Sequence, residues 1–305
     1  MSTLPFYDLA HCSLQDMTGC SASLRALGDG AQSMVAVAEQ ATRLLYHSLR
    51  DAQEHRACAL VRFFKTHPYG ALPPELQAVA QSVFAGEPTS PDVKCMTLMA
   101  SAGERPEWNA TEQSRHHRVI PLVADSFSVR FPMFSQLFRE LGVLLPLKSS
   151  STSDAVIGRT GQHDDVFYIS DALGSSLVPD QQDFVIPYGI RSVLVFGGVL
   201  PSGDAFVMVL FSKVRIQGHT ADLFKPLTLS LKLALLPFDG DAVFDTARET
   251  EKIAPVRRAS ERAAHCHRNA HIALEELLTV QEQTVAASMA RRRRVEEALV
   301  DTRPS

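Results

Sequence analysis

The stretch IRSVLVFGGVLPSGDAFVMVLFSKVRI, residues 190–216, decides the fold class. Two apolar runs flank the turn sequence PSGD at 201–204, and these four residue types favour a tight reversal of the chain. The pattern predicts a β-hairpin over residues 193–213. Because both runs are almost continuously apolar, we expect the hairpin to lie in the centre of an antiparallel sheet, buried on both faces.

Working outward from the hairpin, three more segments have strand character and four have helical periodicity. The predicted strands are residues 57–67, 94–103 and 165–172, and the predicted helices are residues 31–54, 72–86, 131–146 and 220–238. Thr220 is a predicted N-cap of the last helix, and Pro226 inside it predicts a kink or a late helix start. The fold class is therefore α/β (α+β), with an antiparallel sheet covered by helices.

The ends of the chain differ from this unit. Residues 1–30 are rich in Ser and Gly and predict a flexible N-terminal lead, and residues 239–255 predict a linker. Residues 256–305 hold no glycine and are dominated by Ala, Glu, Arg, Leu and Gln, which predicts a long C-terminal helix. Its heptad pattern is imperfect, and we expect a weak coiled coil that makes the protein a homodimer. Glu296 and Glu297 follow the run RRRR at 291–294, so we interpret that run as a solvated helix face.

Composition limits the classes of function. The chain of 305 residues is 45% hydrophobic and 21% charged, as in ordinary globular proteins. A net charge of −4 argues against extended contact with nucleic acid, and no apolar run reaches the roughly 18–20 residues of a membrane span. The five cysteines are scattered, without a CxxC pair, and no secretory signal begins the chain. We therefore expect a cytoplasmic protein with free thiols, no metal site and no membrane partner.

Several phrases resemble the GAF domain family of sensory modules. They are CALVRFFKTH at 58–67, CMTLMASAG at 95–103, DVFYISDA at 165–172 and YGIRSVLVFGGVLPSGDAFVMVLFSK at 188–213, followed by a leucine-rich closing helix. The resemblance covers residues 31–238, with an insertion between the second and third strands. It is similar to the sensor module found ahead of histidine kinase, PAS-type or diguanylate cyclase units.

This resemblance implies a signal-sensing function of the kind that two-component systems use. A small ligand, or a signalling protein, would bind residues 31–238 and change the packing of the helices on the sheet. That change would pass through the closing helix into residues 256–305. The sequence identifies no catalytic residue and no nucleotide-binding motif, and it leaves the cofactor unknown.

The expected ligand pocket lies between the sheet and its inserted segment. We predict five residues in its wall: Cys95, His117, Phe167, Tyr188 and Arg191. Arg191 has a second interpretation of equal weight, an ion pair with Asp171 or Asp183.

Two other functions stay open at this point. Some GAF-fold proteins reduce methionine sulfoxide with cysteines, and Cys58 and Cys95 are the candidate thiols for a thiol oxidoreductase. Such chemistry needs two thiols within disulfide reach and an activating base. The second alternative is a gas or redox sensor that holds heme on one of the eleven histidines.

Overall fold

The computed structural model describes residues 5–83, 90–114, 117–122, 131–140, 166–178, 180–240 and 243–244. Its strands are β1 (Tyr7–Asp8), β2 (Leu49–Arg50), β3 (Cys58–Pro68), β4 (Lys94–Gly103), β5 (Val119–Pro121), β6 (Val166–Ile169), β7 (Ser192–Val199) and β8 (Ala205–Ser212). Its helices are α1 (Leu14–Ala26), α2 (Met34–Ser48), α3 (Pro74–Val83), α5 (Pro132–Glu140), α6 (Gly218–Asp222) and α7 (Lys225–Leu235), with several single turns. The predicted linker, long C-terminal helix and coiled coil lie almost entirely outside the described residues.

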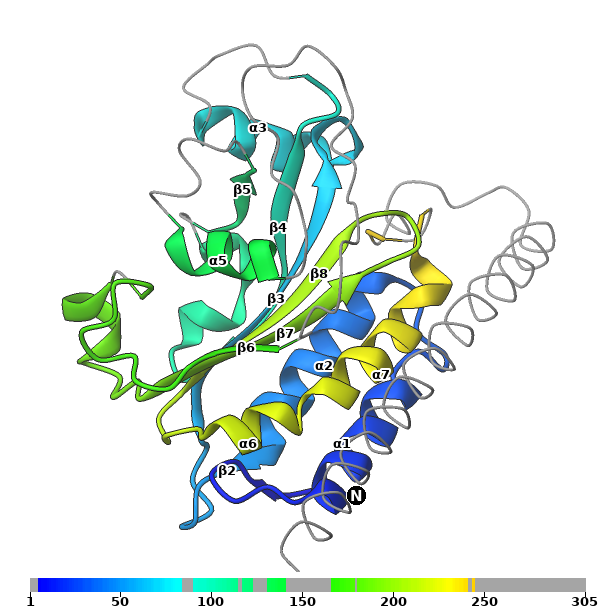
Figure 1. Ribbon diagram of the computed structural model, residues 1–305. Coiled ribbons are helices and arrows are strands. Elements are labelled where there is room, and N and C mark those ends of the chain that lie inside the picture. Colours follow the sequence, from blue (N-terminus) through cyan, green and yellow to red (C-terminus); the bar gives the residue numbers. More distant parts are fainter. Residues whose placement is uncertain are drawn as a thin grey trace, which may run out of the picture. The chain divides into compact units, whose positions relative to one another are not determined.

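Six strands form one antiparallel sheet in the order β5-β4-β3-β8-β7-β6 (Figure 1). The hairpin predicted from residues 193–213 is confirmed as β7 and β8, which pair from Ser192 opposite Ser212 to Val199 opposite Ala205. Neither strand is at an edge, because β8 pairs with β3 and β7 pairs with β6. The near-continuous apolar runs are explained by this position, since both faces of the hairpin are covered.

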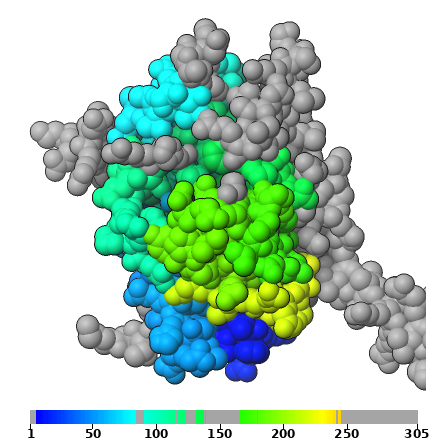
Figure 2. Space-filling model, turned by 90° about the vertical axis from the view of Figure 1, so that its left-hand side faces the viewer, coloured from blue at the N-terminus to red at the C-terminus, as the bar shows by residue number. Residues whose placement is uncertain are grey.

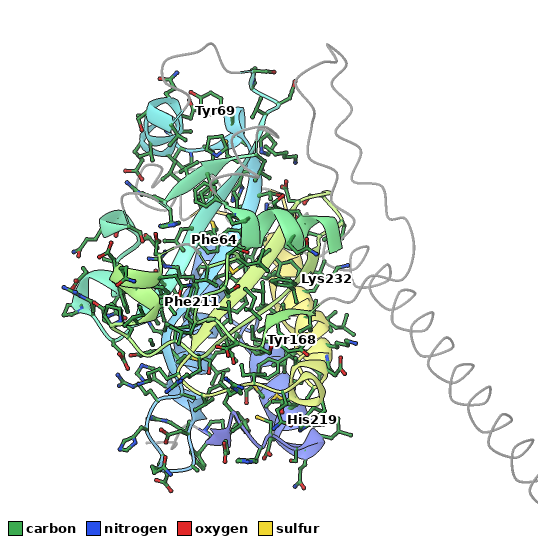
Figure 3. The ribbon with its side chains drawn as sticks, turned by 60° about the vertical axis from the view of Figure 1, so that its left-hand side comes forward. Phe64, Tyr69, Tyr168, Phe211, His219 and Lys232 are labelled. Atoms are coloured by element: carbon green, nitrogen blue, oxygen red, sulfur yellow. The ribbon has the colours of Figure 1, made fainter. Side chains whose placement is uncertain are left out.

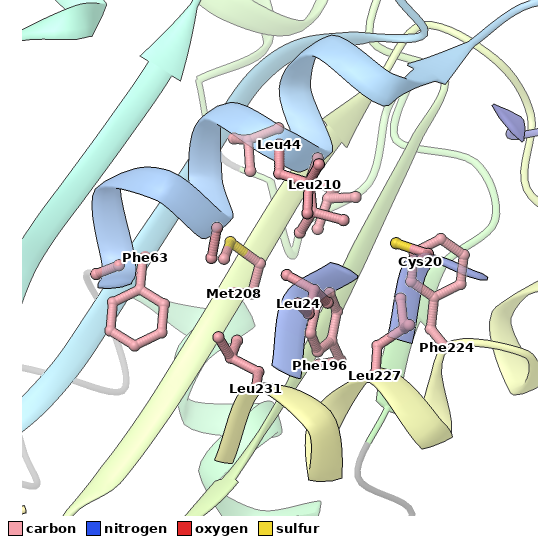
Figure 4. Packing of buried hydrophobic residues seen from close by; sticks show 14 of the residues in the cluster. Cys20, Leu24, Leu44, Phe63, Phe196, Met208, Leu210, Phe224, Leu227 and Leu231 are labelled. Carbon is pink, nitrogen blue, oxygen red and sulfur yellow. The ribbon is translucent and has the colours of Figure 1, made fainter. Parts of the chain in front are cut away.

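Helices α1, α2, α6 and α7 cover one face of the sheet (Figure 1). Figure 4 shows this layer, with Phe63 of β3 and Met208 of β8 packed beside Leu231 of α7. Helix α7 begins at Lys225 with a proline in its first turn, where a missing N–H costs little, so the predicted late helix start is confirmed. Thr220 is not an N-cap: it lies inside α6, which begins after Gln217.

The prediction of a flexible N-terminal lead is wrong for its described part. Residues 14–26 form α1, and its side chains Met17, Cys20 and Leu24 are completely buried in the core of the α2–α7 layer. Ser13 begins the helix with a capping box: its hydroxyl accepts a hydrogen bond from Asp16 N, and the Asp16 carboxylate accepts one from Ser13 N. The three buried positions are too sparse among Ser and Gly to show a strong helical period.

Ser13→Ala should lower the free energy of unfolding by about 1 kcal/mol, because it removes the hydroxyl that caps α1. Thr18→Ala on the same helix is the control, since the exposed Thr18 hydroxyl bonds back to the carbonyl of Leu14. Urea unfolding of both variants measures the difference. Equal stability of wild type and Ser13→Ala would mean that this cap does not stabilise α1.

A buried ionic cluster ties the hairpin turn to β3 and β4. The Asp204 carboxylate accepts hydrogen bonds from Lys65 Nζ at 2.9 Å, Lys94 Nζ at 2.6 Å and Thr66 Oγ1 at 3.2 Å. The Lys65 side chain is 2% exposed and that of Asp204 10%. Burial alone raises the pKa of Asp204, but the charges and hydrogen bonds of the two lysines outweigh it and hold the pKa below its ordinary 3.8. His67 lies nearby, and burial, followed by the charge of Lys65, lowers its pKa to about 3, so its ring is neutral.

The second face of the sheet has a thinner cover. Phe134 and Phe138 of α5 pack on Phe64 and on the apolar residues of β4 and β7. The segment between β6 and β7 covers the rest of this face, and Figure 2 shows it as the light-green middle of the molecular surface. It contains the π-helical turn Gln181–Val185, and π-turns interrupt regular packing. Among the described residues, no helix combines the length and apolar character that crossing a membrane requires.

Candidate functional site

A cavity of about 490 Å³ lies on this second face of the sheet. Its floor is formed by Leu60, Arg62 and Phe64 of β3 and by Phe211 of β8. Figure 3 shows Phe64 and Phe211 one above the other on the sheet. These residues reach the same face because side chains alternate along each strand. The volume is typical of a site for a small organic molecule.

Three separate segments form the walls. Trp108 and His117 come from the connection between β4 and β5, and the residues at 131–134 come from the start of α5. The third wall lies between β6 and β7 and is formed by Leu177, Val178, Asp180, Asp183 and Phe184. The segment between β4 and β6, which the sequence predicts as an insertion over the sheet, thus supplies two walls. The third wall belongs to the segment between β6 and the β7–β8 hairpin.

Aromatic side chains dominate these walls. The Trp108 ring lies 4.5 Å from Tyr188 and 5.6 Å from Phe184, measured between ring centroids, and Phe184 meets Phe211 edge-on at 4.9 Å. Arg105 Nη1 donates to the hydroxyl of Tyr188 at 2.7 Å and also pairs with Glu107, which links the segment at 105–108 to the third wall. Contacts between aromatic rings of this kind fix the positions of the rings at a low cost in conformational entropy.

Arg62 is the cation of the described cavity lining, and its side chain is half-buried. One terminal nitrogen, Nη2, donates to Ser114 Oγ at 2.7 Å, while Nε is completely buried and has no hydrogen-bond partner. Within the described ranges no carboxylate forms an ion pair with it, and desolvation lowers its pKa to about 10, so it remains charged at neutral pH. Arginine is rarely buried without a counter-charge.

Two carboxylates, Asp180 and Asp183, line the opposite part of the cavity. Both are exposed, in contrast to Arg62. The cavity is therefore polar in two ways: a shielded positive charge on the sheet and hydrated negative charges on the outer segment. Between them the lining is aromatic or aliphatic.

The structure brings only some of the five residues predicted from the sequence to the cavity or its surroundings. His117 lines the cavity, and its ring meets Phe131 edge-on at 5.9 Å. Tyr188 packs on the cavity residues Trp108 and Phe184, and Phe167 is buried in the hydrophobic cluster of the same face.

The other two predicted residues lie elsewhere. Cys95 is completely buried in a separate cluster with Tyr69, Leu76 and Val119, beneath α3. Arg191 is exposed at the start of β7 and is not part of the cavity lining. Asp171, one of its two alternative partners, forms its ion pair with Arg215 at 2.9 Å.

Sequence reasoning missed Arg62, Trp108 and the residues of the third wall. A signal for Arg62 was present, because it is a lone charge inside the apolar strand ALVRFF, with Leu60 and Phe64 on the same face. No comparable signal identified Trp108, whose surroundings read as an ordinary polar loop.

The geometry does not bring Cys58 and Cys95 together. Cys95 lies opposite His67 in the β3–β4 register, and the strand from 58 to 67 spans about 30 Å at roughly 3.3 Å per residue. A disulfide needs Cα atoms within about 7 Å. Burial also raises the pKa of both thiols to about 12. Among the described residues, no group of three or more His, Cys, Asp or Glu side chains is arranged to hold a metal ion.

The cavity thus has the features of a binding site: a shielded cation, aromatic walls, and walls drawn from three segments. No protein-family model and no curated protein sequence matches the chain, so comparison with known proteins assigns no ligand to the cavity.

Proposed function

We propose that the chain is a GAF-like signal-sensing module that binds a small ligand in this cavity and relays the bound state through its closing helix. The observation that carries the proposal is the cavity of about 490 Å³, whose described lining combines aromatic rings with one half-buried arginine, Arg62. A site of that size and character binds a small molecule more readily than a protein surface, because a ligand inside it loses most of its contact with water. The mixed fold, with its six-stranded antiparallel sheet, is compatible with the family resemblance.

The sheet offers a path for the relay. Leu60, Arg62 and Phe64 of β3 face the cavity, whereas Val61 and Phe63 belong to the cluster that contains α2 and α7. Strand β8 is arranged in the same way, because Phe211 faces the cavity while Met208 and Leu210 pack with the helices (Figure 4). A ligand that shifts these two strands would change the packing of α7 on the sheet, since packed cores transmit strain. We propose that residues 256–305, in a homodimer, receive this change.

Binding is tested by titrating the protein with anilinonaphthalene sulfonate, a fluorescent aromatic probe. Trp108 is the single tryptophan of the chain and lines the cavity, so energy transfer from it reports a probe bound in or near the cavity. Leu177→Phe narrows the cavity and should weaken binding of the probe at least several-fold. Leu173→Phe makes the same change four residues earlier at an exposed position and should leave binding unaltered.

Two results would contradict the proposal. Absence of saturable transfer from Trp108 would remove the cavity as a binding site, and so would an equal effect of the two leucine variants. The relay is examined separately by amide hydrogen exchange of α7 with and without the probe. Unchanged exchange throughout α7 at saturation would exclude the sheet-to-helix path.

A further inference from the structure

Among the described residues, Arg62 has no carboxylate to balance its charge. Its guanidinium has a buried Nε without a partner, and its one described hydrogen bond goes to a neutral serine hydroxyl. A buried charge without a counter-charge costs free energy, so its presence on an apolar strand is unfavourable for the folded protein alone. A ligand that brings the missing negative charge would reverse that cost.

We propose that the ligand is an organic monocarboxylate with an aromatic or aliphatic body, held by Arg62 at the floor of the cavity. This inference rests on the proposed function and specifies the chemical class of its ligand. Arg62 lines the cavity, and a carboxylate accepts two N–H bonds side by side from the planar end of a guanidinium. The aromatic walls formed by Trp108, Phe184 and Phe211 then enclose the body of the ligand.

The charge of the cavity selects against more highly charged ligands. Arg62 is the single cationic side chain among the described lining residues, and it balances one negative charge. Asp180 and Asp183 also line the cavity and would repel a second one. A phosphate dianion or a dicarboxylate would bring a second negative charge close to these aspartates, whereas Arg62 balances the single charge of a monocarboxylate.

The test uses three probes that share a phenyl ring: phenylpropionate, its neutral amide phenylpropionamide, and the dicarboxylate benzylmalonate. Trp108 fluorescence follows the titrations of wild type, Arg62→Met and Arg62→Lys. In wild type, phenylpropionate should bind at least about 10-fold more tightly than the amide. In Arg62→Met this difference in affinity should disappear. Arg62→Lys should keep part of this difference in affinity, because the lysine ammonium group retains the charge but not the planar pair of N–H donors of the guanidinium. Benzylmalonate should bind more weakly than phenylpropionate.

A second measurement separates ligand binding from a structural role. Arg62→Met keeps the length of the side chain and removes the buried charge, so the melting temperature of the ligand-free variant should equal or exceed that of wild type. A large fall in melting temperature would show that Arg62 holds the fold together and would overturn the proposal.

The remaining outcomes distinguish this inference from the proposed function. If the amide and the carboxylate bind equally well and Arg62→Met changes neither, the cavity binds ligands but the carboxylate assignment is wrong. Tighter binding of benzylmalonate would overturn the restriction to one negative charge. If neither these probes nor anilinonaphthalene sulfonate changes the emission of Trp108, both proposals fail.

Discussion

Asp204→Ala should lower the free energy of unfolding by about 3–5 kcal/mol, because it leaves the buried ammonium group of Lys65 without its counter-charge. The control is Asp171→Ala, which removes a carboxylate at the same 2.9 Å from its cation, Arg215, but at the surface. That variant should lose no more than about 1 kcal/mol. Denaturant unfolding of both variants measures the contrast.

A double variant tests the cause of the loss. Adding Lys65→Met to Asp204→Ala removes the stranded charge and should restore most of the stability, since an apolar side chain suits that buried position. If the double variant is less stable than Asp204→Ala alone, the loss does not come from the unpaired charge.

The same cluster predicts a dependence on pH. The pKa of Asp204 is lower in the folded protein than its ordinary 3.8, so its carboxylate stabilises the fold fully above that value. This contribution falls as the pH drops from about 4 through the lower folded pKa. The difference in unfolding free energy between wild type and Asp204→Asn should therefore be constant near neutral pH and shrink in acid. A difference that grows in acid would contradict this sign.

Gly197→Ala should destabilise the protein by about 3 kcal/mol or more. A methyl group built on Gly197 would overlap the backbone carbonyl oxygen of Phe206 on the neighbouring strand, so β7 and β8 would have to separate near the turn. Gly198→Ala is a matched control, because the nearest atom to its methyl group would be Thr228 Cγ2 at 3.4 Å, an ordinary contact. That variant should stay within about 1 kcal/mol of wild type.

Thermal unfolding of the two glycine variants measures this contrast. The predicted order is wild type and Gly198→Ala close together, with Gly197→Ala far below them. Similar melting temperatures for the two variants would show that β7 and β8 adjust to a side chain at position 197 without a serious loss of pairing.

The sequence predicted the sheet better than the site because the two depend on different information. The hairpin and the late start of α7 follow from local patterns: apolar runs around PSGD, and a proline that tolerates only the first turn of a helix. Helix α1 was missed because its stability comes from packing against α7, which is remote in the sequence.

The cavity depends on such remote contacts throughout. Arg62, Trp108 and Phe184 are far apart along the chain, and only the folded sheet brings them together. His117 was predicted and lines the cavity, whereas Cys95 was predicted from its strand and lies in a different cluster. Alternation along a strand shows which residues share a face, but it does not show which face carries the cavity.

The pairing of β3 with β8 also constrains how the chain folds during its synthesis. Strand β3 is synthesised early, but its partner in the sheet centre, β8, ends only at Ser212. Helix α1 likewise cannot pack against α7 until the chain has been synthesised to Leu235. Ribosomes add roughly 5–20 residues per second, so about 10–40 s separate the completion of α1 from that of α7. Until β8 has been made, the inner edge of β3 has no partner in the sheet, and unpaired strand edges associate with other chains. Folding of this chain is therefore dominated by late, non-local closure, and we expect it to be slow compared with helical proteins of the same size.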